Sequence, residues 1–160
     1  LQPGPPVVGP TSIPGTGVAT TVTINAGTPT PTPTPGPSLA FYSLVPCRLV
    51  DTRNASLGGP ALSGGTTRTF SAAGSCAIPG TAKALVVNVT VTQPTAAGDL
   101  RLFPAGSPLP LASVIAYRAG QTRAGNAVVG LSAAGAFSVR CDQAIGTTTQ
   151  FVLDVAGYFQ

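Results

Sequence analysis

The sequence predicts an all-β domain, a β-sandwich of the jelly-roll or immunoglobulin-like type with about nine strands, behind an extended N-terminal arm. After residue 38 the chain consists of short apolar runs, and Gly or Pro interrupts them every few residues. Several of these runs alternate apolar and polar residues, and none shows helical periodicity. Such segments are typical of stacked antiparallel sheets, because a strand directs successive side chains to opposite faces. We therefore expect one domain over residues 39–160.

The arm covers residues 1–38. The first forty positions hold ten of the 17 prolines and nine threonines, and none of them is charged. Residues 28–35 are four Thr-Pro repeats, which predict a polyproline II rod about 25 Å long. Thr-Pro tracts of exported proteins are also O-glycosylation candidates, with an unmodified spacer as the alternative. The candidate acceptors are Thr28, Thr30, Thr32 and Thr34.

Residues 16–25 are predicted to form a strand inside this arm. The segment is rich in β-branched residues and lacks proline. It has no neighbouring strand with which to form a hairpin, and a lone strand leaves its backbone N–H and C=O groups unpaired. We therefore expect it to add to a sheet edge of its own domain or of another subunit. Its apolar face carries Val18, Thr20, Val22 and Ile24.

In the domain, alternation is clearest over residues 84–92, where Leu85 and three valines alternate with smaller or polar residues. It recurs near the C-terminus, and Gly-containing turn signals separate the other segments. The predicted strands are residues 39–45, 48–52, 67–72, 84–92, 99–103, 112–117, 126–131, 137–141 and 149–155.

The composition argues against several classes of function. Only 8% of the residues are charged, and the chain has no His and four acidic residues, all Asp. General acid–base catalysis and the common metal sites need such groups, so we expect no enzyme activity and no cofactor. The eight Lys and Arg residues are scattered singly, which argues against nucleic-acid binding. No apolar run approaches the length of about 18 residues that suggests a membrane span.

The cysteines and the first residue favour an exported protein. The three cysteines lack the close spacing of metal or redox motifs, and in an exported chain they suggest one disulfide and one odd thiol. The sequence begins with Leu1 instead of Met, which is the expectation for a mature chain after removal of a signal peptide. We expect a secreted protein, at the cell surface or beyond it.

Two motifs resemble a known family. Residues 45–53 read Val-Pro-Cys-Arg-Leu-Val-Asp-Thr-Arg, and residues 153–159 read Leu-Asp-Val-Ala-Gly-Tyr-Phe. Together they resemble the β-domain of exported bacterial surface proteins that opens with Pro-Cys-Arg-x-x-Asp-Thr-Arg and closes with Asp-x-x-Gly-Tyr-Phe. The resemblance covers about residues 41–159 and implies a secreted or cell-surface module without a defined activity.

The resemblance also favours one cysteine pairing. A disulfide between Cys47 and Cys76 would close a loop of about 30 residues, which contributes roughly 3–4 kcal/mol if the bond is unstrained. Cys141 is then the odd thiol. It is either a buried small hydrophobic residue or one half of a bridge between subunits.

The charged residues of the two motifs are expected to form structural ion pairs. The spacing along a regular strand implies that Asp51 cannot share a face with both Arg48 and Arg53. We expect a buried Asp–Arg pair that clamps the first strand to the last, with Asp154 as another partner. The alternative is a calcium site built from Asp51 or Asp154 and backbone carbonyls.

These observations favour a structural role over a binding role. The expected function is a subunit of an extracellular filament or surface assembly, a homopolymer built head-to-tail by donation of the arm strand. The alternative is a secreted glycan-binding or cell-wall-binding module on a Thr-Pro linker, although the chain has no Trp on which a sugar could stack.

Overall fold

The structure, a computed structural model, describes residues 38–160, which contain nine strands and one short 3-10 helix. The predicted arm strand with Val18, Thr20, Val22 and Ile24, and the Thr-Pro rod, lie outside the described residues. The strands are β1 (Phe41–Asp51), β2 (Leu62–Ser63), β3 (Thr67–Ser71), β4 (Ala84–Thr92), β5 (Gly98–Pro104), β6 (Ile115–Tyr117), β7 (Arg123–Gly130), β8 (Ala136–Gln143) and β9 (Thr148–Phe159), and the helix is η1 (Ala55–Leu57).

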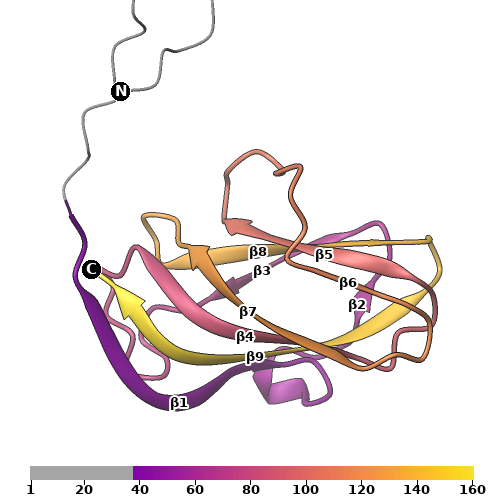
Figure 1. The fold of residues 1–160 in the computed structure, drawn as a ribbon, viewed down its shortest axis with the longest axis horizontal. Helices are drawn as coiled ribbons and strands as arrows, with labels where there is room; N and C mark the ends of the chain where they lie inside the picture. Colours follow the sequence, from indigo (N-terminus) through magenta and orange to yellow (C-terminus); the bar gives the residue numbers. More distant parts are fainter. Residues whose placement is uncertain (1–37) are drawn as a thin grey trace, which may run out of the picture. The chain divides into compact units, whose positions relative to one another are not determined.

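The strands pair as if one long hairpin had been folded over on itself (Figure 1). The antiparallel pairs β1–β9, β3–β8, β4–β7 and β5–β6 are nested in one another around the β5–β6 connection. Two more antiparallel pairings, β9–β4 and β8–β5, join these pairs into sheets. The first sheet has the order β1-β9-β4-β7, with β2 also beside β9, and the second has the order β3-β8-β5-β6. This order is that of a jelly roll, so the predicted β-sandwich is confirmed.

The inner face of the first sheet is formed by the apolar residues that alternate with less buried residues in β4 and β9. Every second residue of β4 from Leu85 to Val91 is at most 1% exposed, and the residues between them are half-buried. In β9, Phe151, Leu153 and Val155 are fully buried. The two strands with the clearest sequence pattern are thus the two central strands of this sheet.

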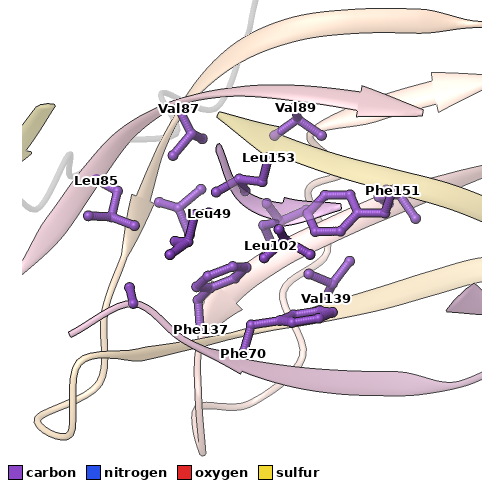
Figure 2. Close-up of a cluster of buried hydrophobic side chains, with 14 of the residues drawn as sticks. Leu49, Phe70, Leu85, Val87, Val89, Leu102, Phe137, Val139, Phe151 and Leu153 are labelled. Carbon is purple, nitrogen blue, oxygen red and sulfur yellow. The ribbon is translucent and has the colours of Figure 1, made fainter. Parts of the chain in front are cut away.

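The second sheet supplies the facing half of the core. Figure 2 shows its side chains, among them Phe137 and Val139, lying opposite those of the first sheet. The ring of Phe70 in β3 lies 5.7 Å from that of Phe137 and 5.9 Å from that of Phe151 in the other sheet. Burial of each large apolar side chain stabilises the domain by about 1.5–3 kcal/mol, so this layer holds the two sheets together.

The first strand differs from the prediction. Residues 39–45 and 48–52 were expected as two strands on either side of Pro46, whereas the structure has one strand, β1. Its register against β9 shifts between Ser43 and Cys47, which is the stretch that contains Pro46. Proline has no N–H to donate, so a strand tolerates it at a sheet edge or at a bulge, and β1 provides both.

Two short strands also differ. β2 was not predicted, because two residues show no periodicity, and it pairs with β9 through Leu62 and Thr149 beyond the end of β1. The strand predicted over residues 112–117 is limited to the three residues of β6.

The beginning of β1 and the end of β9 lie together at one end of the sandwich (Figure 1). Phe41 lies opposite Phe159 with ring centroids 5.3 Å apart, and Tyr42 lies opposite Tyr158 with centroids 5.2 Å apart. Aromatic cross-strand pairs stabilise a sheet and fix its register. The two motifs that lie far apart in the sequence therefore meet on neighbouring strands.

Candidate functional site

The disulfide between Cys47 and Cys76 ties β1 to the loop between β3 and β4. The Cα atoms are 5.7 Å apart and the two cysteines are 29 residues apart in the sequence. The pairing favoured by the resemblance is confirmed. The bond anchors an edge strand whose register is irregular at this point.

Removal of this bond should destabilise the domain strongly. We expect the double variant Cys47→Ser/Cys76→Ser to lose about 3–4 kcal/mol of unfolding free energy, because the unfolded chain regains the freedom of the closed loop. Urea denaturation at 25 °C measures the loss, and reduced wild-type protein should show a similar one. A variant within about 0.5 kcal/mol of wild type, the range of a neutral surface substitution, would contradict this role.

Arg48, Asp51, Arg53 and Asp154 form one ion cluster where β1 meets β9. Nε of Arg48 lies 2.8 Å from Oδ1 of Asp154, and its Nη1 lies 3.3 Å from Oδ2 of Asp51. Nη2 of Arg53 lies 2.7 Å from the same Oδ2. The expectation that Asp51 meets only one of the two arginines is wrong, because the register of β1 shifts between Arg48 and Val50 and brings Arg48 to the side of Asp51.

The burial of this cluster is also uneven. The side chain of Asp51 is 9% exposed, whereas those of Arg48 and Arg53 are 44% and 47% exposed. The expectation of a buried pair therefore holds for the carboxylate and not for its partners. Guanidinium groups snorkel in this way, keeping part of the charge in water while they bind a buried acceptor.

The opening motif acts as a clamp at the end of β1. Oδ1 of Asp51 accepts hydrogen bonds from the backbone N and from Nε of Arg53, at 3.1 and 2.8 Å. The hydroxyl of Thr52 accepts from the backbone N of Phe151 at 2.8 Å and donates to Oε1 of Gln150 at 2.6 Å. Asp51 thus stabilises the turn that follows β1, and Thr52 attaches this turn to β9 through its two hydrogen bonds.

The hydrogen bond from Arg53 lowers the pKa of Asp51 from 3.8 to about 2. A depressed carboxyl pKa stabilises the fold above the unfolded pKa, and the contribution is lost as the pH falls through the folded pKa. We therefore expect Asp51→Asn to lower the urea midpoint at pH 7, with a difference from wild type that shrinks between pH 4 and pH 2. A difference that stays constant over this range would show that Asp51 acts through packing and not through its charge.

A second ion cluster lies on β5 and β8. Asp99 is opposite Asp142 and Arg101 is opposite Arg140, so like charges face each other across the strands. The attractions run diagonally between the strands and along each of them. Nε of Arg101 lies 2.7 Å from Oδ2 of Asp142, and Nε of Arg140 lies 3.0 Å from its Oδ1. Burial raises the pKa of Asp99, and the neighbouring Asp142 raises it further. Sequence analysis missed this cluster; its only local signals are Asp-x-Arg at residue 99 and Arg-x-Asp at residue 140.

The two clusters use every acidic side chain of the protein. The chain has eight Lys and Arg and four Asp, and all four Asp form ion pairs with arginines. Subtracting the four arginines of the clusters from the eight basic residues leaves four, which equals the net charge of +4. The charges left outside the ion pairs are therefore all positive and carry the whole net charge. The four residues that carry the net charge are Arg68, Lys83, Arg118 and Arg123.

Cys141 is the free cysteine, and it is fully buried in β8. The hydroxyl of Tyr117 lies 3.7 Å from its sulfur and donates a 3.0 Å hydrogen bond to Oε1 of Gln143. Burial raises the pKa of the Cys141 thiol. Disulfide formation requires the thiolate and access to it, so the folded domain favours a buried thiol over a bridge between subunits.

A polar row crosses the outer face of the first sheet. The register places Arg48 opposite Asp154, Asp154 opposite Asn88, and Asn88 opposite Asn126, so the row spans β1, β9, β4 and β7. A hollow of about 400 Å³ lies here, lined by Asp154, both asparagines and Pro46 among others. Carboxamides offer both donors and acceptors, which suits a ligand rich in hydroxyl groups. The row could not be found from sequence alone, because it requires the register of four strands.

Four strands form the sheet edges, and β7 is the most regular of them. β6 and β3 have three and five residues, and β1 contains Pro46 and two register shifts. Within residues 38–160, β7 pairs only with β4, without a shift over its eight residues, and its one charged residue is Arg123 at its start. Every second residue of such a strand directs its N–H and C=O away from the sheet. A regular edge with few charges is a site for pairing with another chain.

The inner side of β7 is underfilled at one end. Val129, Ala127 and Gly125 lie on this side, because they pair with buried residues of β4. Val129 is buried and the other two are half-buried. A Cβ built on Gly125 would meet no atom within 4 Å. Near this end of β7 lies a hollow of about 380 Å³, whose lining is Ala116, Tyr117, Arg118, Gln121 and Arg123.

Comparisons with known protein families and with curated proteins find no match for this chain. Over residues 38–160 there is no helix long and apolar enough to cross a membrane. The same residues contain no group of three His, Cys, Asp or Glu side chains that could hold a metal ion, and the carboxylates of Asp51 and Asp154 both bind arginines. Two features of the described residues that could bind a partner are the edge at β7 and the polar row.

Proposed function

We propose that this protein is a structural subunit of an extracellular filament or surface assembly, in which the N-terminal strand of one copy adds to an open sheet edge of the next. The observation that carries this proposal is the regular, nearly uncharged edge at β7. The chain also has, in residues 16–25, a strand-forming segment without a hairpin partner. A segment that needs an edge and an edge that lacks a strand are complementary.

Donation between copies would produce an open polymer. The donor segment and the acceptor edge are different surfaces, so each copy could give one strand and receive one, and such a contact does not have to close. The acceptor edge at β7 carries one charged residue, Arg123 at its start, so little charge opposes strand addition there. The Cys47–Cys76 disulfide supports an oxidising, extracellular location, as does the resemblance to exported surface domains.

A proline in the donor segment tests this proposal. Val22→Pro removes a backbone N–H from the middle of the predicted strand and should abolish filaments without altering the sandwich. Ser12→Pro, in the same arm but outside the strand, is the matched control and should assemble like wild type. Electron microscopy and sedimentation measure assembly, and circular dichroism checks the fold. Normal filaments from Val22→Pro would overturn the proposal.

Glycan binding on the polar row is a second candidate function, and the hollow over Asn88 and Asn126 is the observation that favours it. Retention of the full chain on cellulose, chitin and peptidoglycan tests it. Binding that is lost in Asn88→Ala/Asn126→Ala and kept in Gln121→Ala, an exposed amide outside the row, would support it. Absence of retention on all three materials would contradict it.

A further inference from the structure

We infer that residues 16–25 of one copy add antiparallel to β7 of the next copy, and that they fill the inner face of the sandwich at that edge. This inference rests on the proposed function, because it names the acceptor edge, the direction and the register of strand donation. The cross-strand pairs within β7 are Ile24 with Gly125, Val22 with Ala127, and Thr20 with Val129, and Val18 lies beyond the end of β7.

The edge at β7 is favoured over the other three by its backbone. A donor of ten residues needs a partner of similar length that offers unpaired N–H and C=O groups at regular spacing. β7 offers eight residues in unbroken register, whereas β3 and β6 are shorter. β1 is longer, but its register is broken twice and Pro46 lacks an N–H. The donor has no charged residue, so it adds no unpaired charge to this edge.

The direction follows from the sizes of the side chains. On the inner side of β7 the residues become smaller from Val129 to Gly125. On the apolar face of the donor the largest side chain, Ile24, comes last. Antiparallel addition places this largest side chain beside the smallest residue. Parallel addition would place it near Val129, which is already only 2% exposed and needs no further cover.

The space at Gly125 can receive this side chain. A Cβ on Gly125 would contact nothing within 4 Å, and the hollow beside Arg123 and Tyr117 lies at the same end of the strand. Ile24 would therefore lie beside Gly125, on the inner side of the first sheet. The opposite face of the donor would place Thr23 beside the exposed Asn126, so polar residues would meet on the outer side.

Disulfide trapping tests this register in the full chain. The variant Ile24→Cys/Gly125→Cys, oxidised gently and separated without reductant, should give a ladder of covalent multimers that collapses to monomer on reduction. Val22→Cys/Ala127→Cys tests the same register and should give the same ladder, and it replaces the first variant if that one does not assemble. Wild type and the single-cysteine variants measure the background, which should be low because Cys141 is fully buried.

Two further variants separate the possible failures. Val18→Cys/Gly125→Cys tests parallel addition. Ile24→Cys/Arg68→Cys tests the β3 edge, because Arg68 lies on the same face of β3 as the buried Phe70. Both variants should lose the ladder. One result would overturn this inference and leave strand donation intact. It is filaments and a ladder from one of these two variants, with no ladder from Ile24→Cys/Gly125→Cys or Val22→Cys/Ala127→Cys. Absence of filaments from the wild-type chain, or cross-links only within single chains, would overturn the proposed function itself.

Discussion

Replacement of Gly125 by leucine is expected to abolish filament formation and to leave the domain folded. The new side chain would occupy the space between the sheets that the inferred donor residue Ile24 needs. The fold should tolerate it, because a Cβ at this position meets no atom within 4 Å. A glycine within a strand also weakens the strand, so leucine has no backbone penalty here. Electron microscopy measures assembly, and thermal unfolding followed by circular dichroism measures the fold.

Ala124→Leu is the matched control for this substitution. Ala124 is the preceding residue of β7, it is exposed, and it lies on the opposite face of the strand because it pairs with Thr90 and not with a buried residue. The same increase in size on the outer face should leave filaments intact. Filaments from Gly125→Leu that match wild type in number and length would show that the inner side of β7 does not receive the donor.

Phe151→Ala is expected to cause the largest loss of stability of any single substitution considered for this domain. Phe151 is fully buried in β9, the strand that pairs with β1, β2 and β4. Its ring lies 5.9 Å from that of Phe70 in the second sheet, so it contacts both layers of the core. Truncation of a buried phenylalanine costs about 3–5 kcal/mol, through lost burial and through the cavity that remains. This is a large share of the roughly 5–15 kcal/mol by which a typical domain is stable.

Phe41→Ala controls for the chemistry of this change. Phe41 is 51% exposed and contacts Phe159 at the end of the sandwich, so its truncation should cost no more than about 1 kcal/mol. Urea denaturation of both variants at 25 °C gives the two values. Equal losses would contradict the assignment of Phe151 to the core between the sheets.

Local periodicity explains which parts of the fold could be predicted. The alternation of β4 was visible in the sequence because its partner strands on both sides and the facing sheet bury every second residue from Leu85 to Val91. The same holds for Phe151, Leu153 and Val155 of β9. The burial pattern of such strands can be predicted from their own residues. β2 has only two residues, so it leaves no periodic signal.

The contacts between strands could not be predicted, because register is not a local property. Asp51 binds both arginines of its motif only because β1 shifts its register after Arg48. The ion cluster of β5 and β8 and the polar row depend on which residues lie opposite each other across strands far apart in the sequence. The position of β7 at an edge of the first sheet likewise emerges only from the order β1-β9-β4-β7.

The scarcity of charge has a structural explanation in the domain. All four aspartates are used in ion pairs within the fold, two at the β1–β9 boundary and two across β5 and β8. Charges of this kind fix strands to one another instead of keeping copies of the protein apart.

Cryo-electron microscopy of the assembled material tests strand donation most directly, because it shows the partner of each sheet edge. We expect filaments in which residues 16–25 of one subunit lie antiparallel beside β7 of the next, with the side chain of Ile24 against Gly125 and between the two sheets. Filaments in which β7 faces solvent, or in which subunits touch only through the faces of their sheets, would contradict strand donation.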